Sequence, residues 1–187
     1  MNVESTALPG VLIVTPVVRG DARGSFHESW QQARYAEAGL PTHWVQDNVS
    51  HSARGILRGL HFQHPDGQGK LLSVLNGEIL DVAVDVRRGS PTFARNVSVV
   101  LSRDNHRQLF VPAGFAHGFL VLTDETIVHY KCTEYYRPEL ERVVAWNDPA
   151  LEIQWPIAEP ILSPKDAAAQ RLHELSSDAL PAFVADG

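Results

Sequence analysis

The feature that most constrains this chain is a series of short strand-like segments with no helix between them. Turn signals such as Asn76-Gly77 and Pro112-Ala113-Gly114 separate these segments. The runs are rich in β-branched and large apolar residues, as strands are, and they cover residues 11–18, 71–75, 79–86, 97–101, 108–111, 115–122 and 126–133. Many short strands at close spacing favour a sandwich, barrel or jelly roll, so the predicted class is all-β.

Two further segments predict short flanking helices. Residues 29–32 have the pattern of a capping box, and Gly39 is the expected stop. Residues 163–166 supply a cap, a proline at the first helical position and a first-turn acid, and residues 167–175 can continue that helix. The composition then shifts to Ser, Ala and Pro, which predicts one domain over residues 1–175 and a loose tail over 176–187.

Composition restricts the compartment and the ligands. No apolar stretch approaches the roughly 20 residues of a membrane helix, and the start Met1-Asn2-Val3-Glu4 lacks a signal-peptide pattern. Cys132 is the single cysteine, so we expect no intrachain disulfide and a cytoplasmic location. The net charge of −6 gives no general attraction to nucleic acid or to an anionic membrane. An anionic ligand therefore needs a local basic cluster.

Polar residues inside the strand-like runs indicate a lined cavity. Asp81, His117 and Tyr130 interrupt apolar segments, and alternation in residues 55–63 places His61 and Arg58 on opposite faces. Each residue alone has an ordinary structural interpretation, such as a satisfied core histidine or a buried hydrogen-bonding acid. Together they favour a cavity, because buried polar groups cost free energy unless they have partners. A small barrel can hold one small ligand in its mouth.

Ten motifs in chain order resemble the dTDP-4-keto-6-deoxyglucose 3,5-epimerases of dTDP-L-rhamnose synthesis, also called dTDP-4-dehydrorhamnose 3,5-epimerases. The resemblance covers about residues 11–166. The motifs are Asp-Ala-Arg-Gly-Ser-Phe-His-Glu (21–28), Val-Gln-Asp-Asn-Val-Ser (45–50), Leu-Arg-Gly-Leu-His-Phe-Gln (57–63), Gln-Gly-Lys-Leu (68–71), Asp-Val-Ala-Val-Asp-Val-Arg (81–87), Ser-Pro-Thr-Phe (90–93), Pro-Ala-Gly-Phe-Ala-His-Gly-Phe (112–119), Tyr-Lys-Cys-Thr (130–133), Trp-Asn-Asp-Pro (146–149) and Ser-Pro-Lys-Asp (163–166).

The resemblance implies a cupin-type jelly roll, or double-stranded β-helix, and a homodimer whose N-terminal segment crosses to the partner subunit. It implies an isomerase that inverts C3 and C5 of dTDP-4-keto-6-deoxy-D-glucose without a cofactor, giving dTDP-4-keto-L-rhamnose. By resemblance, His61 is the base and Asp166 orients its imidazole. Tyr130 is the acid on the opposite face, and Lys70, helped by Arg58, stabilises the enolate.

The remaining site residues are expected to contact the substrate or support the inner wall. Two cations would meet the diphosphate, an aromatic residue would stack on the thymine, and polar residues would contact the nucleotide and sugar. These residues are Arg23, Phe26, Glu28, Gln46, Asn48, Asp81, His117, Tyr135, Tyr136 and Lys165. Which of the two adjacent tyrosines stacks on the base stays open, and the loop before Lys70 lacks the Pro-Pro pair of many family members.

Three alternatives stay open at the level of sequence. Relatives that invert only C3 or C5 serve other deoxysugar pathways, and a non-catalytic binder would need the cations alone. A metal-dependent cupin needs two His one residue apart and a following Glu, whereas His61 and His64 are two residues apart. Such a pair points to opposite faces of a regular strand, so no metal ligand is predicted.

Overall fold

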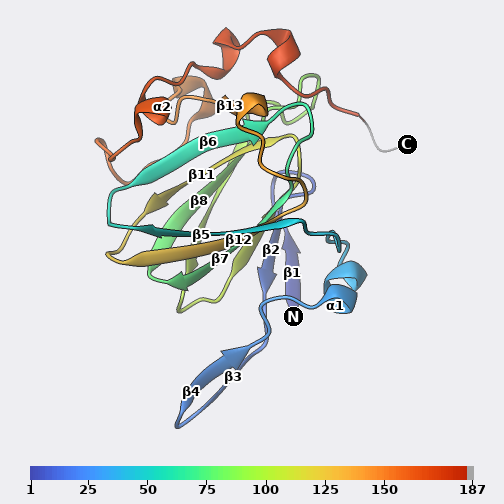
Figure 1. Ribbon diagram of the computed structural model, residues 1–187, viewed down its shortest axis with the longest axis vertical. Coiled ribbons are helices and arrows are strands. Elements are labelled where there is room, and N and C mark those ends of the chain that lie inside the picture. Colours follow the sequence, from blue (N-terminus) through green and yellow to red (C-terminus); the bar gives the residue numbers. More distant parts are fainter. Residues whose placement is uncertain (185–187) are drawn as a thin grey trace.

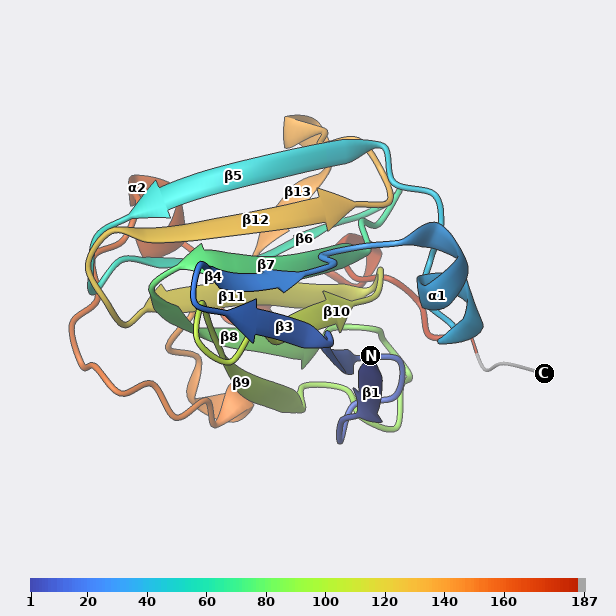
Figure 2. The same ribbon diagram turned by 90° about the horizontal axis from the view of Figure 1, so that it is seen from below.

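The computed structural model describes residues 1–184, and its two large antiparallel β-sheets pack face to face (Figure 1). Figure 2 shows the two layers from below. The six-stranded sheet contains, in order, β1 (Asn2–Ser5), β2 (Leu12–Thr15), β10 (Gln108–Val111), β7 (Lys70–Asn76), β12 (Thr126–Cys132) and β5 (Gln46–Ser52). The five-stranded sheet contains β13 (Glu141–Val143), β6 (Leu57–Gln63), β11 (Phe115–Val121), β8 (Glu78–Asp85) and β9 (Asn96–Ser102). The predicted all-β class is confirmed.

The main core lies between the two sheets and closes one end of the sandwich. It includes Leu72 and Leu109 from the six-stranded sheet, and Ile79, Phe115 and Val121 from the five-stranded sheet. These residues alternate with residues that face outward, as the period of a strand requires. The inner faces at the other end carry the polar residues, so the core supports one wall of the site.

Short segments cover the outer face of each sheet. Helix α1 (Gln32–Glu37) packs Tyr35 against the six-stranded sheet. The segment after β13 covers the outer face of the five-stranded sheet, where Leu151, Leu172 and Leu180 are buried against Val82 and its neighbours. The remaining helices are η1 (Pro138–Leu140), η2 (Pro149–Leu151), α2 (Pro164–Ala167), η3 (Leu172–Glu174) and η4 (Ser177–Ala179).

Both predicted helices exist, but their limits differ from the prediction. Gln31, rather than Ser29, caps α1, because its side chain accepts a hydrogen bond from the backbone N–H of Arg34 at 2.8 Å. Ser163 caps α2 as predicted, yet the helix ends at Ala167. The carbonyl of Gln170 accepts a hydrogen bond from Ala145 at 2.8 Å, so pairing with a distant segment replaces a longer helix.

The loose tail predicted from residue 176 onward includes residues that pack on the domain. Leu180 is 8% exposed, and Arg88 exchanges backbone hydrogen bonds of 2.8 and 2.9 Å with Pro181 and Phe183. The guanidinium of Arg87 lies over the rings of Phe115 and Phe183, at 4.3 and 5.1 Å from their centroids. The chain up to Phe183 therefore packs on the domain, and residues 185–187 lie outside the described residues.

A hairpin of β3 (Val18–Asp21) and β4 (Gly24–His27) forms a separate two-stranded sheet. We call residues 18–27 the arm. Figure 1 shows the arm extending away from the sandwich, and seven of the eight residues in its two strands are exposed. The predicted strand over residues 11–18 therefore ends at Thr15, and Val18 belongs to the arm.

Candidate functional site

A cavity of about 880 Å³ opens between the sheets and borders the apolar core, because Phe119 belongs to both. Strands β5, β6, β7, β11, β12 and β13 line it together with residues 161–166. Ten of the predicted site residues line this cavity: Gln46, Asn48, Arg58, His61, Lys70, His117, Tyr130, Tyr136, Lys165 and Asp166. Residues that are more than 100 positions apart in the sequence thus share one site.

His61 and Asp166 form a hydrogen-bonded pair in the cavity wall. The distance from His61 Nε2 to Asp166 Oδ1 is 2.6 Å, and the carboxylate is only 4% exposed. Burial alone raises the pKa of Asp166, but hydrogen bonds from His61 and from the cap residue Ser163 hold it below its ordinary value. The ionised carboxylate requires Nε2–H as the donor, which leaves Nδ1 of His61 as the ring atom that can accept a proton.

A β-bulge brings Arg58 and His61 to the same face, contrary to the strict alternation assumed from the sequence. His61 pairs with His117, and Arg58 pairs with Phe119, so three residue steps on β6 face two on β11. The extra residue reverses the alternation between the two positions. Both side chains therefore line the cavity, and the sequence-based assignment of Arg58 to the opposite face is wrong.

His117 and Asp81 form a second imidazole–carboxylate pair, deeper in the wall. The distance from His117 Nε2 to Asp81 Oδ1 is 2.5 Å, and the two side chains are 8% and 0% exposed. Asp81 is opposite Phe119 in the register and therefore lies diagonally from His117. Asp81 does not itself line the cavity. It acts on the site by holding His117 next to His61.

Lys70 and Tyr130 present polar atoms to the cavity without a hydrogen bond to any of residues 1–184. Desolvation lowers the pKa of the Lys70 ammonium, against a smaller opposing influence from Cys132 and two acids. Desolvation also raises the pKa of the Tyr130 phenol. The site thus holds an ammonium group that loses its proton more readily than an exposed lysine does, and a phenol that stays protonated at neutral pH.

Alternation on β12 separates Tyr130 from its polar neighbours, as predicted. His129 and Lys131 point away from the cavity to Asp47, at 3.4 and 2.9 Å. Burial opposes the charge of the Asp47 carboxylate, but its interactions with Lys131 and His129 hold its pKa below the ordinary value. One strand therefore carries a cavity phenol on one face and a charged cluster on the other.

The mouth of the cavity carries residues that connect different strands. The side chain of Gln46 donates to Asn48 at 3.0 Å and accepts from the backbone N–H of Tyr136 at 2.9 Å. Lys165 and Glu141 form an ion pair, and the Tyr136 hydroxyl donates to Glu141 at 3.3 Å. These contacts place Tyr136 in the lining, whereas Tyr135 is 58% exposed outside it.

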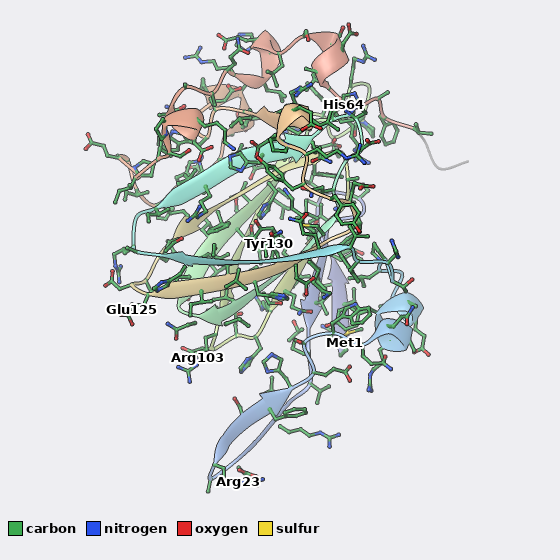
Figure 3. The ribbon with its side chains drawn as sticks, in the orientation of Figure 1. Met1, Arg23, His64, Arg103, Glu125 and Tyr130 are labelled. Carbon is green, nitrogen blue, oxygen red and sulfur yellow. The ribbon has the colours of Figure 1, made fainter. Side chains whose placement is uncertain are left out.

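Three further predicted substrate contacts, in addition to Asp81 and Tyr135, lie outside the cavity of their own chain. Arg23, which Figure 3 labels at the tip of the arm, pairs with Asp21. Phe26, also on the arm, is 73% exposed. Glu28 pairs with Arg34 of α1. A single copy of the chain does not bring these residues to the cavity.

Sequence reasoning missed five polar residues that line the cavity: Ser50, Gln63, Gln68, Glu141 and Ser163. Glu141 belongs to a strand of three residues, too short for a periodic signal, and it reaches the cavity only because β13 pairs with β6. Ser50 lies on β5 between Asn48 and Ser52, with its buried hydroxyl lacking a partner among residues 1–184. Alternation from Gln46 and Asn48 could have identified Ser50.

The histidine pair considered for a metal does not converge. His61 bonds to Asp166, while His64 is absent from the cavity lining; Figure 3 labels His64 well away from Tyr130. Within residues 1–184, no three His, Cys, Asp or Glu side chains form a group that could hold a metal ion. No helix in the same part of the chain is long and apolar enough to cross a membrane.

Comparison with known proteins identifies the family. The family model described as dTDP-4-dehydrorhamnose 3,5-epimerase matches residues 5–174. The enzyme of that name from Pseudomonas aeruginosa is 52% identical over 168 residues, covering 89% of this chain and 93% of the relative. A longer relative from Neisseria gonorrhoeae is 48% identical, and this chain spans 55% of its length.

Solved structures agree with the sequence relatives. The 3,5-epimerase of Legionella pneumophila in complex with dTDP-4-keto-L-rhamnose has a TM-score of 0.95 and 50% identity, over 98% of this chain and 99% of that one. A 3'-monoepimerase of Streptomyces bikiniensis, in complex with dTDP-quinovose, has a TM-score of 0.90 and 37% identity, over 95% and 91% of the two chains. The expected cupin-type jelly roll and the resemblance stated from the motifs are confirmed. This chain belongs to the dTDP-4-dehydrorhamnose 3,5-epimerase family.

Proposed function

We propose that this protein inverts C3 and C5 of dTDP-4-keto-6-deoxy-D-glucose to give dTDP-4-keto-L-rhamnose. The observation that carries the proposal is the His61–Asp166 pair, which shares one cavity with Tyr130 and Lys70. A binding protein needs cations for the diphosphate but has no use for an oriented imidazole and a protonated phenol. Family membership and the ligand-bound relative from Legionella support the same substrate.

The chemistry needs a base, an acid and a site for negative charge. The C3 and C5 protons are acidic because each carbon is next to the C4 ketone. Nδ1 of His61 removes such a proton, while Asp166 stabilises the imidazolium that forms. The electron pair of the broken C–H bond becomes an enolate whose oxygen meets Lys70. Tyr130 then protonates the carbon from the other face, and solvent restores both groups.

The second imidazole–carboxylate pair and the arm support this reaction. His117, fixed by Asp81, packs beside His61 and limits the positions that the His61 ring can take.

The exposed arm supports the proposal of a homodimer, in which Arg23 and Phe26 of one protomer reach the cavity of its partner. Arg23 would then bind the diphosphate and Phe26 the base, opposite Tyr136. The location that we propose is the cytoplasm, because a single cysteine that is not in a disulfide fits a reducing compartment.

Incubation with the keto-sugar nucleotide in D₂O, followed by proton NMR, tests the proposal. We expect loss of the C3 and C5 proton signals at rates that match the appearance of the L-configured product. His61→Asn should abolish both processes, whereas Tyr130→Phe should slow inversion more than exchange, because abstraction does not need the phenol. Wild-type exchange rates in His61→Asn would show that the base is another group.

A single inversion is the second candidate, since the relative from Streptomyces bikiniensis is a 3'-monoepimerase of similar structure. The same NMR experiment separates the two reactions. Exchange at one carbon alone, even after long incubation with excess enzyme, would assign this chain to the single-inversion group and contradict the double epimerisation.

A further inference from the structure

One aromatic ring contact joins the arm to the sandwich within the described residues. No hydrogen bond joins residues 18–27 to the remainder of residues 1–184, and its two strands pair only with each other. At the root of the arm, the ring of His27 lies 4.7 Å from the ring of His106, centroid to centroid, with the planes tilted by 55°. His27 pairs with Val18 and so closes the hairpin at the end nearest the sandwich.

His106 belongs to a rigid loop of the sandwich. Asn105 fixes this loop, because its side chain accepts from the backbone N–H groups of Ser102 and Arg107 and donates to the carbonyl of Val100. His106 itself adopts a left-handed conformation, with φ of 54°. This uncommon conformation, which histidine tolerates better than most residues, directs the side chain out of the loop. The loop thereby presents a fixed ring to the arm.

We propose that His106 is a positioning residue for the arm, and that its ring holds His27 while both imidazoles are neutral and releases it when they are charged. The inference rests on the proposed function, in which the arm carries Arg23 and Phe26 to the partner's cavity. A neutral pair of rings attracts by contact and dispersion. Two imidazolium cations at this distance repel each other, and the desolvation of His27 opposes its charge.

In the part of the chain that the structure describes, no charged group near His27 offsets this repulsion. Burial lowers the pKa of His27, and the charge of His106 lowers it further. Charged side chains on the neighbouring segments are on β3, in the loop of His106 and just after β4: Arg19, Asp21, Arg103, Asp104, Arg107 and Glu28. Glu28 is engaged by Arg34, and Asp21 by Arg23. Among the described residues, only His106 shifts His27 through its charge.

The inference is tested by measuring KM at pH 8 and at pH 5.5. Each KM is divided by the KM of a control variant at the same pH. The control is Asp104→Ala, an exposed position in the same loop with no hydrogen bond to residues 1–184. His106→Asn removes the ring but keeps a residue that tolerates the left-handed conformation. At pH 8 it should raise KM about 2- to 10-fold, the size of one aromatic contact, and leave kcat within about twofold.

The pH dependence separates positioning from a structural role. We expect wild type to approach the KM of His106→Asn at pH 5.5, whereas His27→Phe, which keeps a ring without a proton, should keep its pH 8 value. By NMR, the pKa of His27 should rise toward its ordinary value in His106→Asn. A control-like KM for His106→Asn at pH 8, or wild-type pH dependence in His27→Phe, would overturn the inference.

Arg23→Ala distinguishes failure of this inference from failure of the proposed arm. If Arg23→Ala raises KM and His106→Asn does not, the arm contributes to binding but the histidine pair does not position it. If Arg23→Ala leaves KM unchanged, the assignment of the arm to the substrate site is wrong, and the positioning role is wrong with it.

Discussion

At the scale of single residues, two lysines on neighbouring strands show how direction determines role. Lys70 faces the cavity, while Lys131 faces outward and pairs with Asp47 at 2.9 Å. A preorganised cation at a developing oxyanion contributes about 10²- to 10³-fold to kcat. We therefore expect Lys70→Met to lower kcat by that factor, with a much smaller change in KM. Steady-state kinetics with the keto-sugar nucleotide will measure both parameters.

Lys131→Met is the matched control, because it removes the same charge from the other face of the sheet. Its kcat should stay within a few-fold of wild type. Equal losses in the two variants would mean that the overall field of the protein, rather than Lys70 itself, stabilises the enolate.

The wild-type kcat should also fall as pH rises toward 10.5, the ordinary pKa of a lysine. The pKa of Lys70 is lowered, so its positive charge is lost at a lower pH than that of an exposed lysine.

The same scale shows which site residues a sequence can specify. Their chemical types are visible, because Asp81 and His117 interrupt apolar strands. Their partners are not, because the pairing of His61 with Asp166 joins positions 105 residues apart and depends on how α2 packs against β6. The inward direction of Arg58 was also inaccessible, since a one-residue bulge reverses alternation without changing composition.

At the scale of elements, the bulged pairing of β6 with β11 controls the geometry of the site. A Cβ added at Gly118 would lie 2.7 Å from the carbonyl oxygen of Arg58 and 3.1 Å from Cα of Gly59. Gly118→Ala should therefore push the strands apart and displace His61. A displacement of about 1 Å at a catalytic group can lower the rate about 100-fold. We expect a loss of that order in kcat, measured where unfolding curves show the variant to be folded.

Val121→Ala provides the comparison on the same strand. Val121 is 1% exposed in the core and outside the cavity lining, so its truncation should destabilise the fold by roughly 1–3 kcal/mol without displacing His61. A folded Gly118→Ala with wild-type kcat would contradict the role assigned to the bulge. Equal kcat losses in the two variants would indicate general loosening of the sandwich instead.

Elements with dense apolar content were predictable, and those stabilised by distant contacts were not. Each end of strands β7 to β12 lies within one residue of the predicted segment. The arm has no core to face, so its exposed residues carry no alternating signal. Six of the seven residues of β5 are polar, because its inner face lines the cavity and its outer face is exposed and carries Asp47. The hydrophobic pattern fails on strands that have few apolar residues to pack into a core.

At the scale of the whole molecule, a buried carboxylate ties the C-terminal segment to the sandwich. Asp85, which is 0% exposed, accepts hydrogen bonds from the Arg87 guanidinium and the hydroxyls of Ser90 and Thr92. Arg87 in turn lies between Phe115 and Phe183. The prediction of a loose tail failed here because the composition of residues 176–187 does not show that Leu180 and Phe183 have partners on the sandwich.

The stability of the whole fold should therefore depend on the charge of Asp85. Burial opposes that charge, but the hydrogen bonds outweigh burial and keep the pKa of Asp85 below its ordinary value of 3.8. Since the folded state binds this proton less readily than the unfolded state, the stabilisation is complete above that value and is lost as pH falls below it. Asp85→Asn should lower the free energy of unfolding by about 3–5 kcal/mol at pH 7.

Urea unfolding of wild type, Asp85→Asn and the exposed control Asp104→Asn, at one protein concentration, measures this dependence. The gap between wild type and Asp85→Asn should be constant from pH 7 to 5 and should narrow below about 4, because wild type then loses the charge that the variant already lacks. Asp104→Asn should follow wild type throughout. A gap that stays constant down to pH 3 would show that Asp85 contributes through its shape and hydrogen bonds alone, and not through its ionisation.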